Sequence, residues 1–298
     1  MRVVSLPDVE PGSARRHVAI GTFDGVHLGH REVIRGADTV LTFEPHPLTV
    51  VAPQAAPRLL TDLETRADLI AALGVRELVV IPFDGAFAAQ SPQAFIDDVL
   101  VGVLGAEQVS VGENFRFGHR ARGDVALLRE QTAFTTRVVG LVEADGEVVS
   151  SSRIRRLVEA GDIAAANRLL GAPFAMRRPV VHGDMRGRTL GYPTANLVPD
   201  PALVCPAFGV YACRATIEVD GTWTPWPAAT SVGVRPTFVT GHGVLAEAFL
   251  LGFEGDLYGR ELRLSFLERL RGEERFESVD DLVAQMARDV EDTRRMTA

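Results

Sequence analysis

The sequence predicts two domains: an α/β domain built on a parallel sheet, followed by a small antiparallel β-barrel or sandwich that a C-terminal helix closes. Three observations predict this fold class. The chain has 298 residues, more than the roughly 100–200 residues of one domain. In residues 1–170, short apolar runs alternate with helix-like segments, which is typical of a parallel sheet covered by helices. In residues 171–298, β-branched and aromatic runs are separated by Gly and Pro, which is typical of antiparallel sheets.

The strands of the first domain are expected to be short and buried. Each is an apolar run too short for a helix, as in a parallel sheet that is covered on both faces. The predicted strands are Val18–Thr22, Thr39–Phe43, Leu78–Pro82, Val109–Gly112 and Thr136–Leu141.

The helices between these strands begin at recognisable caps. Thr61 and Glu64 have the spacing of a capping box, and Ser91 precedes Pro92 as an N-cap precedes a first-turn proline. The first helix has little room, because only the eleven residues Arg31–Leu41 lie between His30 and Thr42 of the second predicted strand. We expect this helix to be minimal or its crossover to be strained.

The boundary between the domains follows a helical stretch, Arg153–Leu170, and is marked by Gly171 and Pro173. A final helix is expected after Ser278, because serine is a favourable N-cap residue. The predicted strands of the second domain include Gly209–Ile217, Ala228–Val234 and Leu262–Leu267.

The composition argues against several classes of protein. The formal charge of −8 argues against nucleic-acid binding through a broad basic face. All 31 basic residues are Arg, so the chain has no lysine for a Walker-type or Schiff-base site. No apolar run approaches the ~18 residues that span a bilayer, and the N-terminus has no long apolar signal segment. Cys205 and Cys213 are expected to be reduced thiols, and the protein to be cytoplasmic.

The segment after the first of these strands has the features of a phosphate-binding loop. Gly21, Gly25 and Gly29 lie between a strand and a helix, where backbone amides can approach phosphate oxygens and the helix dipole favours negative charge. His27 and His30 would stand at the helix start and donate to a triphosphate whose α-phosphorus gains negative charge. The pattern therefore indicates nucleotidyl transfer, which needs no protein nucleophile if the acceptor is itself a phosphate.

A second group of phosphate ligands is predicted near the end of the first domain. Ser150, Ser151 and Ser152 open a helix together with Arg155. Hydroxyl and guanidinium groups at a helix N-terminus suit a phosphate, although an ordinary solvated cap would look the same. The group supports nucleotidyl transfer only in combination with the histidine motif.

The second domain begins with another glycine-rich segment. Gly183 and Gly191 would let the chain wrap phosphates, and Thr194 and Asn196 present neutral oxygens two residues apart on one face of an extended segment. Such oxygens suit Mg²⁺ that already carries ATP phosphates. On physical grounds alone, a turn followed by a strand is the simpler explanation of this segment.

Together these motifs resemble those of the prokaryotic bifunctional riboflavin kinase/FAD synthetase family. The first motif is similar to that of HxGH nucleotidyltransferases, and GRTLGYPTAN at residues 187–196 is nearly identical to a riboflavin kinase signature. The resemblance implies a Rossmann-like nucleotidyltransferase domain and a β-barrel kinase domain, which make FMN and then FAD from riboflavin and ATP with Mg²⁺. It extends through the segments Phe43–Pro47, Gly112–Gly118, Gly209–Tyr211, Arg235–Phe238, Asp256–Gly259 and Leu270–Phe276.

The resemblance also implies roles for individual residues. Glu247, in the strand after the RPTF element, is the expected kinase base. A carboxylate suits that role because it can accept the proton of the ribityl 5′-hydroxyl as this oxygen attacks the γ-phosphate. The further ATP-binding residues implied are Phe23, Asp24, Arg188 and Pro193, and the flavin-binding residues implied are Pro45, Pro47, Asn114 and Phe115.

Two alternatives to a bifunctional enzyme remain open at this point. A paralogue with a working kinase and a weakened or repurposed nucleotidyltransferase half would account for the short first crossover. A non-catalytic flavin-binding regulator is less compatible with the histidine pair and Glu247, since binding alone needs no general base. The expected partners are riboflavin, FMN, FAD and ATP, with neither nucleic acid nor a membrane, and the sequence leaves the oligomeric state open.

Overall fold

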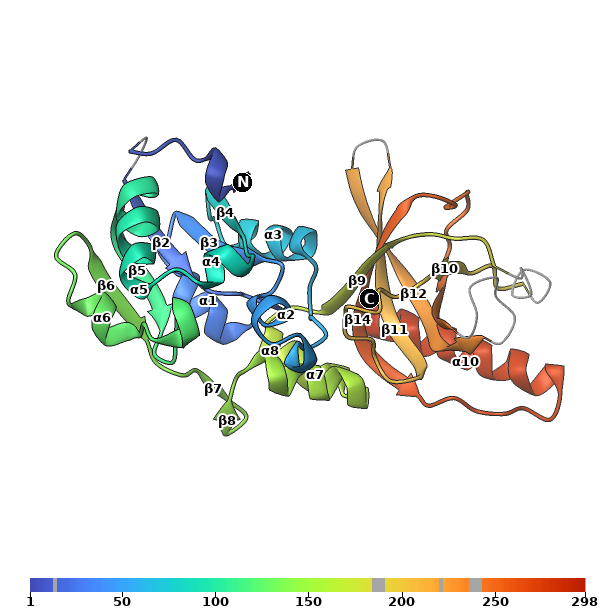
Figure 1. The fold of residues 1–298 in the computed structure, drawn as a ribbon. Coiled ribbons are helices and arrows are strands. Elements are labelled where there is room, and N and C mark those ends of the chain that lie inside the picture. The colour runs from blue at the N-terminus through green and yellow to red at the C-terminus, as the bar shows by residue number, and fades with distance from the viewer. Residues whose placement is uncertain (13–14, 184–190, 220–221, 236–242, 298) are drawn as a thin grey trace. The chain divides into compact units, whose positions relative to one another are not determined.

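Figure 1 shows the computed structural model, which describes residues 1–12, 15–183, 191–219, 222–235 and 243–297. The chain forms two compact units, Met1–Ser151 and Ser152–Ala298. This division falls before the helical stretch that precedes Gly171, whereas the boundary expected from the sequence falls after it. The assignment of that stretch to the first functional domain stays a prediction.

The first unit is an α/β structure in which all five predicted strands are present, with small shifts at their ends. Strand β1, which pairs with β4 at the edge of the sheet, is an addition that the sequence patterns do not predict. The strands are β1 (Arg2–Ser5), β2 (Arg16–Ile20), β3 (Thr39–Glu44), β4 (Glu77–Pro82), β5 (Ala106–Gly112), β6 (Thr135–Val139), β7 (Glu143–Ala144) and β8 (Glu147–Val148). The helices are η1 (Leu6–Asp8), α1 (Leu28–Ile34), α2 (Pro47–Val51), η2 (Pro53–Ala55), α3 (Leu63–Ala71), α4 (Gly85–Ala88), α5 (Pro92–Ala94), η3 (Phe95–Val103), η4 (His119–Ala121) and α6 (Val125–Arg129).

Strands β1 to β6 form one parallel sheet in the order β1-β4-β3-β2-β5-β6. From β2 the chain adds β3 and β4 on one side, and it later adds β5 and β6 on the other. The strand order therefore reverses between β2 and β5. In open parallel sheets such a switch point opens a crevice outside the carboxyl ends of the strands, where ligands bind. The loops after β2 and β5 are accordingly the expected place for a site.

The side chains of this sheet pack in two hydrophobic layers. Val18 and Ile20 of β2 belong to the layer that includes η3 and α6, whereas Ala19 belongs to the layer that includes α1 and α3. Consecutive residues of a strand point to opposite faces, so a strand covered on both faces is apolar throughout. This packing explains the nearly continuous apolar runs of the sequence.

The predicted helix caps of this unit are confirmed in one case and wrong in another. Ser91 caps α5 as expected, since its hydroxyl accepts the amide of Ala94 at 3.1 Å. The capping box at Thr61 is wrong, because the N-cap of α3 is Asp62, whose carboxylate accepts the amide of Thr65 at 2.7 Å. The Thr61 hydroxyl instead bonds to Asp24 and Gly25 in the loop after β2.

The first crossover has a minimal helix, as the sequence predicts. Residues 21–38 connect β2 to β3, and α1 occupies only seven of them. The loop before α1 supplies the remaining length, so that Val18 pairs with Thr39 in a regular parallel register. A count that starts at His30 leaves this loop out and therefore underestimates the connection.

The described residues of the second unit form two helices, a curled six-stranded antiparallel sheet and a C-terminal helix (Figure 1). The sheet has the order β10-β13-β12-β11-β14-β9. The predicted continuous helix Arg153–Leu170 is interrupted at Gly161, whose φ of 81° lies in the left-handed region. The elements are α7 (Ser151–Ala160), α8 (Ile163–Leu170), β9 (Phe174–Pro179), β10 (Ala195–Leu197), β11 (Gly209–Val219), β12 (Thr222–Arg235), β13 (Gly243–Leu250), β14 (Glu261–Arg271) and α10 (Val279–Thr297).

Strand β11 illustrates how this sheet forms its core. Cys213, Ala215 and Ile217 are fully buried, while Arg214 between them is exposed. Alternation of this kind places one face of an antiparallel sheet against the core and leaves the other polar.

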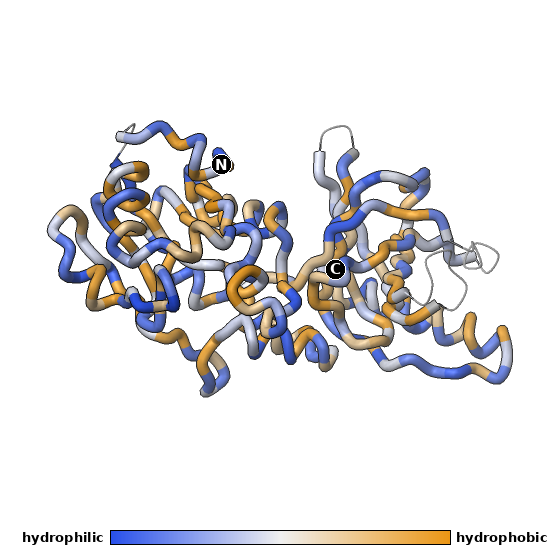
Figure 2. The backbone as a smooth tube through the Cα atoms, viewed as in Figure 1, coloured by the Kyte–Doolittle hydropathy of each residue, from blue (hydrophilic) through white to orange (hydrophobic). Residues whose placement is uncertain are grey.

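Helix α10 is joined to the sheet by a charged pair. Arg271 of β14 donates to the Asp289 carboxylate through Nη2 at 2.8 Å and Nε at 3.0 Å. Ser278 caps the helix as predicted, because its Oγ accepts the amide of Asp281 at 3.1 Å. Figure 2 shows hydrophilic residues along the whole described chain, and none of its described helices combines the length and apolar character that a membrane span requires.

Candidate active sites

The loop that follows β2 is held in a conformation that few side chains adopt. Phe23 and Val26 have φ values of 50° and 43°, in the left-handed region. This region is strained for a bulky or β-branched residue and persists only where the surroundings fix it. Both side chains are buried in the core, at 1% and 0% exposure. Strain held in this way often marks a functional loop.

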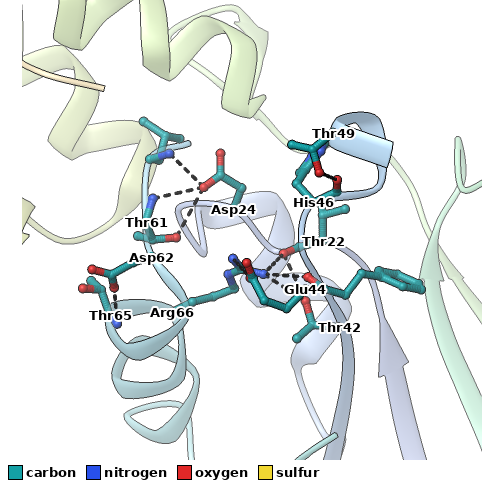
Figure 3. Close-up of polar contacts among 12 residues, drawn as sticks. Thr22, Asp24, Thr42, Glu44, His46, Thr49, Thr61, Asp62, Thr65 and Arg66 are labelled. Carbon is teal, nitrogen blue, oxygen red and sulfur yellow. Dashed lines mark hydrogen bonds and ion pairs between the residues drawn. The ribbon is translucent and has the colours of Figure 1, made fainter. Parts of the chain in front are cut away.

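The segment just before α3 fixes the middle of this loop (Figure 3). One carboxylate oxygen of Asp24 accepts the Leu60 amide at 2.8 Å, the Thr61 amide at 3.1 Å and the Thr61 hydroxyl at 3.3 Å. The amide of Gly25 donates to the Thr61 hydroxyl at 3.1 Å. These contacts give Asp24 a structural role, while its contact with ATP stays a prediction.

His27 and His30 stand at the N-terminus of α1. Nδ1 of His27, the N-cap, accepts the amide of His30 at 3.3 Å, so the neutral ring carries its proton on Nε2 and can donate from there. The two rings stack with centroids 3.5 Å apart and planes at 17°, and the Phe23 ring meets His30 edge to face at 5.4 Å. Gly29 permits this packing, because a Cβ there would lie 3.2 Å from the His27 ring. The imidazoles are therefore held side by side.

Ser151, which is distant in the sequence, forms a hydrogen bond to the same loop. Its hydroxyl donates to the backbone carbonyl of Asp24 at 3.0 Å, across 127 residues of sequence. Ser150 lies directly before it. Ser152 and Arg155 fall in the second compact unit, so their part in the nucleotide site stays a prediction.

The residues expected to bind flavin lie in the loops after β3 and β5. Pro45 is exposed and joined to Glu44 by a cis peptide bond, and Pro47 opens α2. Asn114 is exposed and Phe115 is half-buried in the loop after β5. Because β3 and β5 are the two neighbours of β2, both loops start beside the histidine loop.

A row of phenylalanine rings starts at Phe115. Of these rings, the sequence predicts only Phe115 as a binding residue. Neighbouring ring centroids lie between 5.5 and 6.2 Å apart. Half-buried members of such a row offer flat apolar surface to a planar ring system. No local spacing signals the row, because its members come from several elements. In order of contact they are Phe115, Phe117, Phe95, Phe87, Phe83 and Phe43.

In the second unit, the predicted metal ligand and the predicted base lie opposite each other. β10 and β13 pair so that Asn196 faces Glu247. Directly opposed residues point to the same face of the sheet, with Cβ atoms about 4.5–5.5 Å apart. Thr194 comes two residues before Asn196, which favours the same face if the chain is extended there. On the other side of β13, Ser231 is opposite Glu247, a neighbour that only the strand register reveals.

Asn196 is a suitable magnesium ligand by its surroundings. Its side chain is 5% exposed, and its Oδ1 has no hydrogen-bond partner in the described part of the chain. Gly183 packs against the same side chain, since a Cβ there would lie 2.3 Å from Nδ2. A buried oxygen is rarely left without a partner, and a neutral amide oxygen is a good ligand for Mg²⁺. The residues present therefore fit the ion.

The rest of the glycine-rich segment is only partly described. Gly191 has a φ of 86°, which favours glycine at this position, and Pro193 follows two residues later. Arg188 lies outside the described residues, so its predicted contact with ATP stays a prediction.

Comparison with known proteins identifies both halves of the chain. Residues 10–153 match the FAD synthetase family and residues 170–297 match the riboflavin kinase family. A bifunctional riboflavin kinase/FMN adenylyltransferase of Escherichia coli K12 is 40% identical over 286 residues, which cover 91% of this chain and 90% of that protein. The Listeria monocytogenes protein of the same name is 36% identical over 294 residues, which cover 94% of this chain and 92% of that one.

A solved structure has the same fold along its whole length. The crystal structure of a macrolide-efflux protein from Streptococcus pneumoniae aligns with a TM-score of 0.87 and 31% identity over 99% of both chains. That name belongs to the Streptococcus protein alone, whereas the two family matches and the bifunctional relatives above agree with each other across this chain. The chain belongs to the bifunctional riboflavin kinase/FMN adenylyltransferase family.

Proposed function

We propose that this chain phosphorylates riboflavin to FMN in residues 171–298 and adenylylates FMN to FAD in residues 1–170, using one ATP in each step. One observation supports assigning the two reactions to different parts of the chain. The histidine pair lies within the first compact unit, and the Asn196–Glu247 pair lies within the second. Each unit thus holds its own set of groups for phosphate chemistry.

In the kinase step Glu247 acts as general base. Its carboxylate accepts the proton of the ribityl 5′-hydroxyl while that oxygen attacks the γ-phosphorus, and ADP leaves. The opposed Asn196 supports this role, since it would keep the phosphate end of ATP next to the base. Ser231, on the other neighbouring strand, is placed to help orient the carboxylate.

Thr194 and Asn196 are the residues that would hold Mg²⁺ with the ATP phosphates. The ion would neutralise phosphate charge, which this lysine-free chain can otherwise offset only with Arg, His and backbone amides. The buried oxygen of Asn196 and its contact with Gly183 support this assignment. Gly191, Pro193 and Arg188 are assigned to the same nucleotide.

In the adenylylation step the FMN phosphate attacks the α-phosphorus of ATP, and pyrophosphate leaves. No protein nucleophile is needed, so the protein contributes position and charge stabilisation. His27 and His30 donate to the phosphate oxygens, and the strained loop before them holds the pair in position. The serines at 150–152 and Arg155 complete the proposed phosphate contacts.

The flavin of this step is assigned to the loops after β3 and β5. Pro45, Pro47 and Asn114 would line its edge, and Phe115 would stack with the ring system, supported by the phenylalanine row behind it. The partners proposed are therefore riboflavin, FMN, FAD and ATP. The acidic charge and the two cysteines, which form no disulfide, support a cytoplasmic location without nucleic-acid or membrane partners.

A product assay tests the proposal directly. The full chain is incubated with riboflavin, ATP and Mg²⁺, and riboflavin, FMN and FAD are separated by chromatography over time. FMN should rise first and FAD should follow as FMN falls. Absence of FAD when FMN is supplied would remove the adenylylation half of the proposal, and unchanged riboflavin would remove the kinase half.

A further inference from the structure

Helix α3 contains an arginine that is almost completely buried. Arg66 is 2% exposed and its guanidinium lies at the carboxyl edge of the parallel sheet (Figure 3). Nη1 donates to the backbone carbonyl of Thr22 at 3.1 Å, and Nη2 lies 3.2 Å from a carboxylate oxygen of Glu44. Nη1 also lies 3.3 Å from the hydroxyl of Thr42 and 3.4 Å from the carbonyl of Phe43. One side chain thus joins the ends of two neighbouring strands.

Stability alone gives no reason for a charge at this position. Removing a guanidinium from water is costly, and an apolar residue of similar size often serves a core as well or better. The arrangement is also incomplete, because Nε of Arg66 is buried without a partner among the residues that the structure describes. A buried group of this kind calls for another explanation.

The two ends that Arg66 joins belong to different halves of the adenylylation site. Thr22 lies in the loop that carries the histidine pair, and Glu44 lies directly before Pro45 on the flavin side. We propose that Arg66 is a positioning residue for adenylyl transfer, which keeps the nucleotide loop and the flavin-side loop in a fixed spatial relation. This inference rests on the proposed function, which assigns these two loops to ATP and to FMN.

The segment just before α3 also holds the nucleotide loop. Leu60 and Thr61 bind Asp24 and Gly25 in the nucleotide loop, which attaches that loop to the segment leading into α3. Arg66 extends this attachment to Glu44 on β3. The loop after β2 and the loop after β3 are therefore held to one rigid helix.

The reaction depends strongly on such a fixed relation. The FMN phosphate must lie in line with the α-phosphorus of ATP, and a displacement of about 1 Å can lower the rate about 10²-fold. Arginine suits the task because its planar group donates to several acceptors in fixed directions, whereas lysine offers one mobile point charge. A lysine at position 66 would keep the charge and lose the geometry.

The test compares Arg66→Met and Arg66→Lys with a matched control, Arg16→Met. Arg16 is also buried, at 5% exposure, and binds Glu77 and the carbonyl of Leu104 at the opposite edge of the same sheet. We expect kcat/KM for FAD formation from FMN to fall about 10²-fold in Arg66→Met and about 10-fold in Arg66→Lys. Riboflavin phosphorylation should be unchanged in both variants. Arg16→Met should lower the melting temperature at least as much as Arg66→Met and leave kcat/KM within about twofold.

Two further variants keep the inference testable if Arg66→Met fails to fold. Glu44→Gln removes the charge from the half-exposed partner of Arg66 and should raise KM for FMN with KM for ATP unchanged. His27→Ala serves as a reference for the proposed function itself. If His27→Ala lost FAD formation while Arg66→Lys and Glu44→Gln retained wild-type constants, the inference would be wrong and the proposed function would stand. If His27→Ala also kept FAD formation, the proposed function would be wrong.

Discussion

Asn196 on β10 and Glu247 on β13 occupy directly opposite positions in an antiparallel pair. The register brings together a residue proposed to hold the metal and a residue proposed to accept a proton, although they are far apart in sequence. Because opposed side chains share a face, the base and the phosphate end of ATP would meet above the same two strands. The geometry of the proposed kinase site is thus a consequence of strand pairing.

Loss of the Thr194 hydroxyl tests the proposed metal ligand. Thr194→Val keeps the side-chain volume and removes the oxygen, so we expect FMN formation to fall below about 1% of wild type at saturating Mg²⁺. Adenylylation of supplied FMN in the same sample should be unchanged and serves as the control for folding. A wild-type rate of FMN formation would show that Thr194 is not a ligand.

The contact between Gly183 and Asn196 gives a second test of the kinase site. Gly183→Ala would put a Cβ 2.3 Å from Nδ2 of Asn196, so the amide must move away from its present position. We expect FMN formation to fall about 10-fold or more, because a displaced ligand costs both binding and alignment. Gly272→Ala is a matched control, since its Cβ would make only an ordinary contact at 3.8 Å. Equal rates for the two variants would contradict the assignment of Asn196.

The histidine pair is tested by removing one imidazole at a time. His27→Ala and His30→Ala should each lower FAD formation from FMN by about 10²-fold or more, the usual effect of losing one preorganised donor. Riboflavin phosphorylation, measured in the same preparations, should stay near wild type. Parallel loss of both activities would mean that the two steps do not have separate sites.

The sequence predicts those parts of the sites that depend on local order along the chain. The positions of His27 and His30 at the start of α1 follow from a strand, a glycine-rich turn and a helix in succession. The capping box expected at Thr61 is wrong because a distant segment intervenes: Thr61 bonds to Gly25 and Asp24, and Asp62 takes the cap. A local pattern cannot reveal that a distant loop competes for a hydroxyl.

The parts that the sequence does not predict depend on contacts between distant segments. Arg66 has the pattern of an ordinary charged residue on a helix, and only the fold buries it against the ends of β2 and β3. The phenylalanine row likewise draws its rings from several elements. Glu247 is assigned through the family resemblance, and its pairing with Asn196 requires the strand register.

The two cysteines should differ sharply in reactivity. Burial raises the pKa of the Cys213 thiol to about 12, so this group keeps its proton at pH 8, whereas Cys205 is partly exposed. Because the thiolate is the reactive form, a thiol reagent should label the native protein at Cys205 alone. Cys205→Ser should then show no labelling until the protein is unfolded, while Cys213→Ser should label like wild type. Rapid labelling of native Cys205→Ser would contradict the buried position of Cys213.

Two separate sets of residues are proposed to catalyse the two steps, and Glu247→Gln distinguishes them. The substitution keeps the size of the side chain and removes the basic carboxylate. The measurement is the rate of FMN formation from riboflavin and, in the same preparation, the rate of FAD formation from supplied FMN. We predict that the kinase kcat falls about 10²- to 10⁴-fold, with riboflavin binding and FAD formation unchanged. Wild-type FMN formation would show that Glu247 is not the base, and an equal loss of both activities would show that the two steps do not use separate residues.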